Sequence, residues 1–373
     1  MDTLAIFGST GSIGTTSLNL YKKNKKKFNL LYLSAHNNYR KLKILEKKFN
    51  PKKIILTNKK LSNSIILNDK KIILEKNLFD KNKKKIDYVI SGVSGYEAID
   101  FNFKLLKITK NLLIANKETI ICGGKIFLKK AKKYNCNIIP VDSEHYCIHL
   151  LLSSFSNLKL INKIYLPASG GPLLNKKKIN YKEKLNTVLK HPNWKMGKNI
   201  SIYSSNLTNK ILELFEANIL FKIPPSKLSI LIEDQSKVHS IIETNSKIFF
   251  SVMHYPSMEV PLSNALNIKN NTSISFKNLN IKFQLPDLKK FPLINLGYKI
   301  LNSKSHYGMI MFTVFNEKLT NMYIRKEISY GDIHSFLVKA FKNKSIKNKL
   351  KIKTLHLNGI KKAIEFSKDF KLT

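Results

Sequence analysis

The sequence is poor in arginine and in acid, although it is strongly basic. Its 373 residues include 24 Asp and Glu against 66 Lys and Arg, which gives a formal net charge of +42. Arg40 and Arg325 are the only arginines, so almost every positive charge is a lysine. Sites that read bases or grip phosphates through two parallel hydrogen bonds favour arginine. Lysine, asparagine and isoleucine are instead abundant along the whole chain. This pattern indicates compositional drift and disfavours a nucleic-acid-binding protein.

Cysteine is also scarce, and long apolar runs are missing. Cys122, Cys136 and Cys147 show no CxxC spacing. They fit neither a disulfide framework nor a zinc site, and they favour a reducing cytosol. No apolar run is long enough to span a bilayer, and a strand predicted within a few residues of Met1 leaves no room for a signal peptide. We therefore predict a cytoplasmic protein with no membrane partner and no specific nucleic-acid partner.

Short apolar runs do alternate with helical periods through the first part of the chain. Strands are predicted at 3–7, 28–35, 52–57, 86–93, 111–118 and 136–144. Such alternation predicts a doubly wound parallel sheet. We predict an α/β fold with a Rossmann-like N-terminal domain over 1–145, a second α/β domain over 146–265, a linker over 266–295 and a small helical domain over 296–373.

A glycine-rich turn, "GSTGSIG" (8–14), follows the first predicted strand and opens a helix. Its glycines allow a tight turn close to a pyrophosphate, and the helix N-terminus supplies N–H groups and a positive dipole end. An NAD site wants an acidic residue about 20 residues further on, but none occurs between Asp2 and Glu46. The second strand ends instead in "HNNYRK" (36–41), which favours NADP. The alternative is a plain glycine-rich turn.

Two carboxylates, Asp142 and Glu144, follow another apolar strand in this acid-poor chain. A helix predicted over 204–221, capped by Ser204 or Ser205, carries four polar residues on one face: Asn209, Lys210, Glu213 and Glu216. Hard oxygen ligands without histidine or cysteine indicate magnesium or manganese. Two alternatives stay open, a helix cap with first-turn acid around Asp142 and a solvated i,i+3 pair of Lys210 with Glu213.

Two loops complete the candidate site. "ASGGP" (168–172) is a second glycine turn, suited to an anion. "HPNWKMG" (191–197) contains Trp194, the only tryptophan of the chain, and such a loop could close over a substrate. A surface loop whose tryptophan simply packs down is the alternative.

These motifs, in this order, resemble the 1-deoxy-D-xylulose 5-phosphate reductoisomerase family. The matching segments are GSTGSIG (8–14), ANKE (115–118), PVDSEH (140–145), ASGGP (168–172), HPNWxMG (191–197), NKxLExxEAxxLF (209–221) and QSxVHS (235–240). The resemblance implies NADPH- and divalent-metal-dependent rearrangement and reduction of 1-deoxy-D-xylulose 5-phosphate to 2-C-methyl-D-erythritol 4-phosphate, by a homodimer in isoprenoid precursor biosynthesis. The domain over 146–265 would be catalytic, with a flexible loop.

The resemblance also implies a role for each matching residue. The metal ligands would be Asp142, Glu144 and Glu213. Residues that hold the phosphosugar would be Lys117, Ser143, Ser169, His191, Ser204, Asn209 and Lys210. NADPH would contact Thr10, Gly11, Ser12, Ile13, Asn37, Asn38, Asn116, Glu118 and Gly197.

The chain departs from the family's usual pattern at Tyr203, Glu233, Asp234 and Glu259. None of these residues is among the implied metal ligands or phosphate contacts, so reduced stability or turnover is expected with the reaction class unchanged. The alternatives are an inactive family member, another NADP-dependent oxidoreductase and a basic binding protein.

Overall fold

The computed structural model describes residues 1–58, 60–61, 71–73, 75–79, 84–155, 157–275, 277, 279–353 and 355–372. The chain forms two compact units. The first unit contains 1–119, 127–142 and 258–271, and the second contains 120–126, 143–257 and 272–373. The domain boundaries predicted at 145, 265 and 295 stay predictions.

A seven-stranded sheet, counted over the described residues, forms the centre of the first unit. Its order is β4-β3-β2-β1-β5-β6-β7, and all neighbouring strands are parallel. The strands are β1 (Asp2–Phe7), β2 (Phe28–Ala35), β3 (Lys53–Leu56), β4 (Ile72–Ile73), β5 (Ile86–Ser91), β6 (Thr109–Ile114) and β7 (Asn137–Pro140). The predicted parallel sheet is confirmed. The chain winds outward in both directions from β1, so the carboxyl ends of β1 and β5 form a switch point of the kind where ligands bind.

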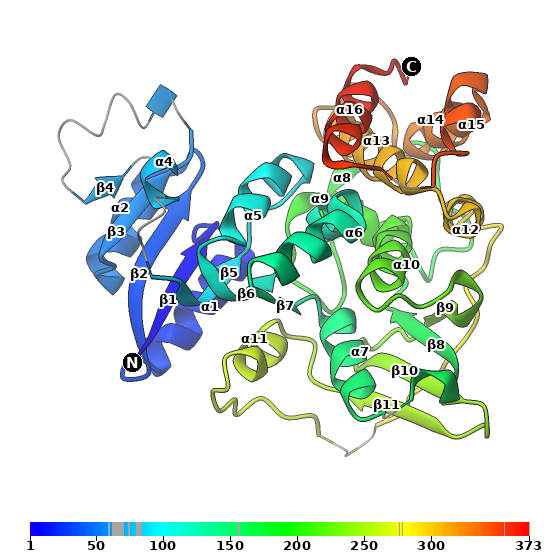
Figure 1. Cartoon of the computed structure of the whole chain (residues 1–373). Coiled ribbons are helices and arrows are strands. Elements are labelled where there is room, and N and C mark those ends of the chain that lie inside the picture. Colours follow the sequence, from blue (N-terminus) through cyan, green and yellow to red (C-terminus); the bar gives the residue numbers. More distant parts are fainter. Residues whose placement is uncertain are drawn as a thin grey trace. The chain divides into compact units, whose positions relative to one another are not determined.

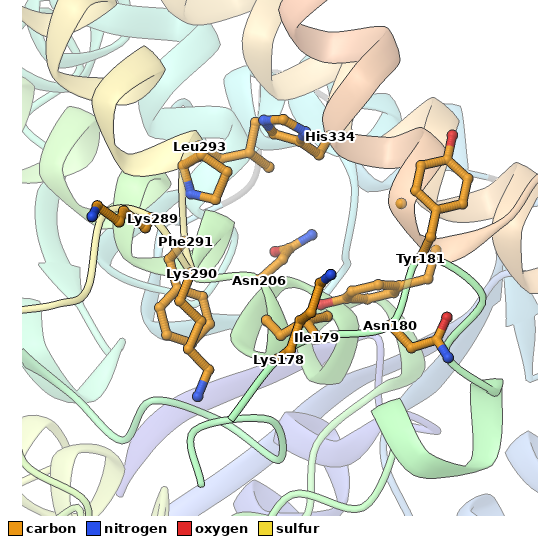
Figure 2. A pocket seen from close by; sticks show the side chains of 13 residues that line it. Lys178, Ile179, Asn180, Tyr181, Asn206, Lys289, Lys290, Phe291, Leu293 and His334 are labelled. Carbon is orange, nitrogen blue, oxygen red and sulfur yellow. The ribbon is translucent and has the colours of Figure 1, made fainter. Parts of the chain in front are cut away.

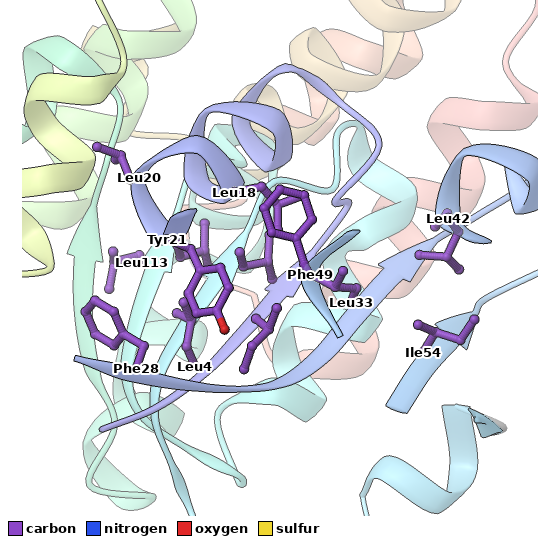
Figure 3. Close-up of a cluster of buried hydrophobic side chains, with 14 of the residues drawn as sticks. Leu4, Leu18, Leu20, Tyr21, Phe28, Leu33, Leu42, Phe49, Ile54 and Leu113 are labelled. Atoms are coloured by element: carbon purple, nitrogen blue, oxygen red, sulfur yellow. The ribbon is translucent and has the colours of Figure 1, made fainter. Parts of the chain in front are cut away.

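Helices cover this sheet and bury its apolar side chains. They are α1 (Ser12–Lys23), α2 (Tyr39–Phe49), α4 (Glu75–Leu78), α5 (Ile99–Leu105), α6 (Lys117–Lys133) and α11 (Glu259–Ala265), with a short 3-10 turn, η2 (Tyr96–Ala98). Figure 3 shows Leu18 and Tyr21 of α1 among strand residues such as Leu4 and Leu33. Leu262 of α11 belongs to the same cluster, and each buried leucine contributes about 1.5–3 kcal/mol. The segment 258–271 therefore completes the core of the first unit.

The second unit contains a four-stranded sheet in the order β11-β10-β8-β9. Its strands are β8 (Ile161–Ala168), β9 (Leu228–Ile232), β10 (Val238–Thr244) and β11 (Phe249–Met253). β8 runs parallel to β9, and β10 runs antiparallel to both β8 and β11. The helices of this part are α7 (Ser143–Ser153), α8 (Leu185–Val188), α9 (Lys198–Ser205) and α10 (Thr208–Leu220), with 3-10 turns η3 (Leu158–Leu160) and η4 (Pro225–Lys227).

The last part of the second unit is helical, as predicted. It comprises α12 (Leu293–Ser303), α13 (His306–Ile324), α14 (Tyr330–Lys342), α15 (Lys344–Lys349) and α16 (Leu357–Asp369). Helix α13 packs against α14 and α16, and α10 packs against α12 (Figure 1). In the segment before these helices, the backbone of Gln284 pairs with Ile232 at the edge of the sheet. Among the described helices, none is both long and apolar enough to cross a membrane.

Candidate active site

The glycine turn after β1 is held closed by very close backbone approaches. Gly8 has φ +75°, and a Cβ there would lie 2.7 Å from the carbonyl oxygen of Gly92. A Cβ on Gly14 would lie 2.4 Å from the carbonyl oxygen of Gly8. Helix α1 begins directly after this turn, at Ser12. The turn therefore presents a helix N-terminus at the carboxyl end of β1, at the predicted pyrophosphate contacts Thr10, Gly11, Ser12 and Ile13.

The end of β2 is basic and exposed. Asn38 caps α2, because its side chain accepts a hydrogen bond of 3.0 Å from the backbone N–H of Lys41. The Lys41 ammonium donates to the carbonyl oxygen of Thr10 at 2.8 Å. The Asn37 side chain accepts from Asn58 at 2.7 Å. This arrangement places a lysine beside the glycine turn, as an NADP site would require.

The segment "ANKE" turns from strand to helix, contrary to the strand predicted over 111–118. β6 ends at Ile114, and Asn116 caps α6 by accepting from the N–H of Thr119 at 2.7 Å. Lys117 and Glu118 thus lie in the first turn of the helix. A carboxylate there interacts favourably with the positive end of the helix dipole. The Lys117 ammonium lies 2.9 Å from the carboxylate of Asp142, and both side chains are largely buried. Burial raises the pKa of Glu118, and the charge of Lys117 opposes that rise.

The segment "PVDSEH" also leaves its strand early. β7 ends at Pro140, and Ser143 and Glu144 begin α7, so the strand predicted through 144 is too long. Glu144 does lie in a first helical turn, as one alternative proposed. Ser143 Oγ donates to Glu144 at 2.5 Å. Asp142 is the last residue of its segment of the first unit. Glu144 follows it by two residues.

Two carboxylates and one ammonium meet inside the second unit. The Lys210 ammonium lies 2.7 Å from Glu144 and 2.5 Å from Glu213. The carboxylate oxygens of Glu144 and Glu213 lie within 4.8 Å of each other. The Lys210 and Glu213 side chains are only 4% and 1% exposed, which excludes the solvated pair proposed as an alternative. Although burial opposes it, the charges of Glu144 and Glu213 raise the pKa of Lys210.

This cluster has the donors that a divalent cation requires. The buried Glu213 and the partly exposed Glu144 place two carboxylates against one ammonium. Their net negative charge is unfavourable at low dielectric without a further cation. Their oxygens are hard ligands that suit magnesium or manganese. The residues therefore fit such an ion.

The predicted cap of the α10 helix is wrong. Ser204 and Ser205 end the preceding helix, α9, and α10 begins at Thr208 after Leu207, which has φ +60°. Leu207 is the N-cap residue, and the side chain of Asn206 before it accepts from the N–H and hydroxyl of Thr208 at 3.0 and 2.7 Å. The sequence pattern did not indicate this break between α9 and α10, because the hydrophobic residues keep helical spacing across it.

Two of the predicted phosphate residues, Ser169 and Ser204, meet at the second glycine turn. Gly170 and Gly171 have φ +78° and +67°, and a Cβ on Gly171 would lie 2.5 Å from the carbonyl oxygen of Ser204. Ser169 Oγ accepts from the N–H of Gly171 at 3.2 Å. This close approach brings the turn against the end of α9, and only glycine permits it. The side chain of Asn209, one turn before Glu213 on α10, donates to Glu213.

His191 joins the long loop to this turn. Its Nδ1 accepts from the backbone N–H groups of Asn193 and Trp194 at 3.1 and 3.0 Å. The ring proton therefore lies on Nε2, which donates to Ser169 Oγ at 2.9 Å. Burial lowers the pKa of His191 to about 4, so the ring is neutral near pH 7. At the other end of the loop, Gly197 caps α9.

His145 is a buried residue whose role is not predicted from the sequence. Its Nδ1 lies 3.2 Å from Glu216, and its Nε2 lies 3.0 Å from the carbonyl oxygen of Glu213. The His145 and Glu216 side chains are 0% and 2% exposed. This ring therefore fixes the α10 backbone at Glu213. Its position next to Glu144 in the sequence was the available signal.

A separate hollow of about 690 Å³ lies in the second unit (Figure 2). It is lined by residues of three segments: 178–181, 289–293 and the start of α14, together with Asn206. None of the predicted site residues lines it. The hollow is therefore distinct from the residues that bear the predicted chemistry.

Comparisons with known proteins agree on one family. A 1-deoxy-D-xylulose 5-phosphate reductoisomerase model matches residues 4–124, the C-terminal domain model of that enzyme matches 138–221, and a DXP reductoisomerase C-terminal domain model matches 253–363. A 1-deoxy-D-xylulose 5-phosphate reductoisomerase of Pelagibacter ubique (strain HTCC1062) is 36% identical over 356 residues, which cover 91% of this chain and 90% of that relative. One of Ehrlichia canis (strain Jake) is 33% identical and covers 89% of each.

Solved structures give the same result. A crystal structure of DOX-P reductoisomerase with NADPH, fosmidomycin and magnesium has a TM-score of 0.87 and 27% identity, and covers 99% of this chain and 98% of that chain. The 1-deoxy-D-xylulose 5-phosphate reductoisomerase of Zymomonas mobilis, solved with NADPH, shares the fold with a TM-score of 0.79 at 24% identity, and covers 99% of this chain and 100% of that chain. The predicted fold class is thereby confirmed over nearly the whole chain.

Proposed function

The chain belongs to the 1-deoxy-D-xylulose 5-phosphate reductoisomerase family, and from this premise we propose how its own residues carry the family's reaction. The chain uses NADPH and a divalent metal ion to rearrange and reduce 1-deoxy-D-xylulose 5-phosphate to 2-C-methyl-D-erythritol 4-phosphate. The observation that carries this proposal is the buried cluster of Glu144, Lys210 and Glu213. Removing these charges from water destabilises the fold, and a bound divalent cation would offset that cost.

Asp142, Glu144 and Glu213 are the proposed ligands of Mg²⁺ or Mn²⁺. When bound, the ion would supply Lewis-acid polarisation of the substrate's ketone and hydroxyl oxygens. Lys117 holds the carboxylate of Asp142 at 2.9 Å, and Ser143 holds that of Glu144 at 2.5 Å. These two side chains orient the ligands, and they are also the proposed contacts to the sugar.

Ser169, Ser204, Asn209 and Lys210 are proposed to bind the substrate phosphate. Support comes from the glycine turn that packs against Ser204 and from the Ser169–His191 hydrogen bond. The Lys210 ammonium is committed to Glu144 and Glu213 in this structure. Binding phosphate would therefore require it to exchange one of these partners.

NADPH is proposed to bind at the carboxyl edge of the first sheet and would supply the hydride. Its pyrophosphate would meet Thr10, Gly11, Ser12 and Ile13 at the start of α1. Asn37 and Asn38 lie beside Lys41, which would attract a 2′-phosphate. Asn116, Glu118 and Gly197 are proposed for the nicotinamide half. Because the Asn38 and Asn116 side chains already cap helices, we assign them the role of shaping the site.

The decisive assay is NADPH oxidation with 1-deoxy-D-xylulose 5-phosphate, with and without Mg²⁺. We expect metal-dependent oxidation, and a loss of more than about 100-fold for Glu213→Gln, since outer partners of a metal ligand alone are worth 10- to 100-fold. Glu46→Gln is the matched control, because Glu46 also follows a lysine by three residues on a helix.

Other results would favour the alternatives. A folded protein that binds NADPH but does not oxidise it with any divalent metal would indicate an inactive member or another NADP-dependent oxidoreductase. Oxidation that is retained in Glu213→Gln would refute the proposed ligand set.

We also propose that the enzyme is a cytoplasmic homodimer that acts on a small phosphosugar. Support for the dimer is the family resemblance, and support for the location is the pattern of free cysteines, all three of which are buried. Sedimentation of the purified protein tests the dimer, and fractionation of cells tests the location.

A further inference from the structure

Three rings stand in a row within the second unit, and one of them belongs to no motif of the resemblance. The Trp194 and His239 rings form a T-shaped contact with a centroid distance of 6.0 Å and an interplanar angle of 82°. The His239 ring lies flat on His254, with centroids 3.6 Å apart and planes within 9°. His239 and His254 are 2% and 8% exposed. We call these three residues the ring stack.

Hydrogen bonds fix the two imidazoles in the ring stack. His239 Nε2 lies 3.1 Å from the carbonyl oxygen of His254, and His254 Nδ1 lies 2.7 Å from that of Tyr255. The backbone N–H of His254 also donates to Lys237 at 3.0 Å. Because carbonyl oxygens only accept, each ring donates from the nitrogen named. Neither ring can rotate without losing a buried hydrogen bond.

The loop that carries Trp194 is held at a second point beside the ring stack. The Asn193 side chain donates to the carbonyl oxygen of Asp234 at 2.5 Å and to Ser236 Oγ at 3.1 Å. These acceptors lie on the turn between β9 and β10. The loop thus rests on this turn and on the rings together.

Glu233 organises that turn from inside the protein. Its buried carboxylate accepts from the backbone N–H groups of Gln235, Lys237 and Val238 at 2.8, 2.7 and 3.1 Å. Glu233 is one of the departures from the family's usual pattern, and here it satisfies three backbone donors. We therefore interpret it as part of the loop's support.

The ring stack lies close to the predicted chemistry. His191 precedes Trp194 by three residues and donates to Ser169, so a fixed Trp194 also fixes His191. The charge of Glu144 acts on both imidazoles of the stack, although burial dominates and lowers their pKa values. A substitution of His254, which packs on His239, would therefore change the position of the loop 191–194.

We propose that His254 is a positioning residue for the reaction: its ring supports His239 from behind, so that Trp194 packs and the loop 191–194 holds His191 against Ser169. The kinetic part of this inference rests on the proposed function. The structural part does not, because the loop's position is measurable without substrate.

Trp194 makes the test direct, since it is the only tryptophan of the chain. We expect His254→Ala to shift its emission to longer wavelength and to increase its quenching by acrylamide in the substrate-free protein. KM for 1-deoxy-D-xylulose 5-phosphate should rise by about two- to tenfold, the range for one aromatic pair, with a smaller change in kcat. His254→Phe keeps a flat ring and should restore both readouts.

His149→Ala is the matched control, because His149 is an exposed histidine of the same unit outside the ring stack. Unchanged Trp194 emission and quenching in a folded His254→Ala protein would overturn the proposal. So would a His254→Phe protein that behaves like His254→Ala, because the imidazole rather than the stacking would then matter. A changed emission in a protein without reductoisomerase activity would uphold the positioning role and refute the proposed function instead.

Discussion

Helices α2 and α10 each contain a lysine followed three residues later by a glutamate, and the two pairs differ in how deeply the lysine is buried. In α2, the side chains of Lys43 and Glu46 are 29% and 8% exposed. In α10, Lys210 and Glu213 are 4% and 1% exposed, and Glu144 joins them. Helix α2 lies on its sheet with one face in water, whereas α10 is packed by α7, α9, α12, α13 and two strands. The same spacing therefore gives a pair with a partly exposed lysine in one unit and, in the other, a charge cluster whose lysine is itself buried.

The largest effect that would test this comparison is on stability. Lys210→Met removes the one ammonium between the buried Glu213 and the partly exposed Glu144, so we expect the free energy of unfolding to fall by about 3–5 kcal/mol. Lys43→Met in α2 should change it by less than about 1 kcal/mol. Denaturant unfolding of both variants measures the difference. Equal losses in the two proteins would contradict the contrast between the helices.

A smaller effect on stability is expected in the glycine turn of the first unit, where Gly8 and Gly11 have different surroundings. Gly8→Ala introduces a Cβ at φ +75° and 2.7 Å from Gly92, which should cost about 1–3 kcal/mol of stability. It should also weaken NADPH binding. A Cβ at Gly11 would meet nothing nearer than 3.4 Å, so Gly11→Ala should leave the stability nearly unchanged. Thermal unfolding and NADPH titration check both, and a destabilised Gly11→Ala would show that the whole turn is strained.

The smallest effect is the response of the second unit to acid. Burial lowers the pKa of His191 to about 4, and burial together with His254 lowers that of His239 to about 4, from an ordinary value near 6.5. The unfolded chain therefore binds more protons between about pH 6.5 and 4, and stability should fall as the pH falls through this window. Denaturant unfolding at several pH values measures the slope. His191→Asn should reduce it, and an unchanged slope would mean that His191 does not titrate as its burial implies.

Some of the site was predictable because short-range physics determines it. Gly8 and Gly14 follow an apolar strand and precede a helix, and their close backbone approaches follow from that local order. β2 has the predicted bounds because its apolar run is clear and polar residues mark its end. The run "ANKE" was misread because strand-like apolar residues lead directly into a capped helix, and the cap by Asn116 outweighs the local preference.

Other features could not be read from spacing. The helical period runs unbroken through Ser205 to Thr208, so only the left-handed backbone at Leu207 shows where α9 ends and α10 begins. His254 lies fifteen residues from His239 in the sequence, and nothing between them predicts that their rings stack. The resemblance identified the reaction, but it described Glu233 only as a departure.

The sequence by itself determined the parallel sheet, the glycine turn, the family and the identity of the acidic residues, because each depends on local order or on a run of specific motifs. Only the tertiary structure decided which charges are buried, how Lys210 divides its ammonium between Glu144 and Glu213, and what supports the loop of Trp194. The physical reason is that burial and electrostatic interaction depend on distance in space. Lys117 and Lys210 are buried among the described residues of this lysine-rich chain, and both contact the carboxylates of the proposed site.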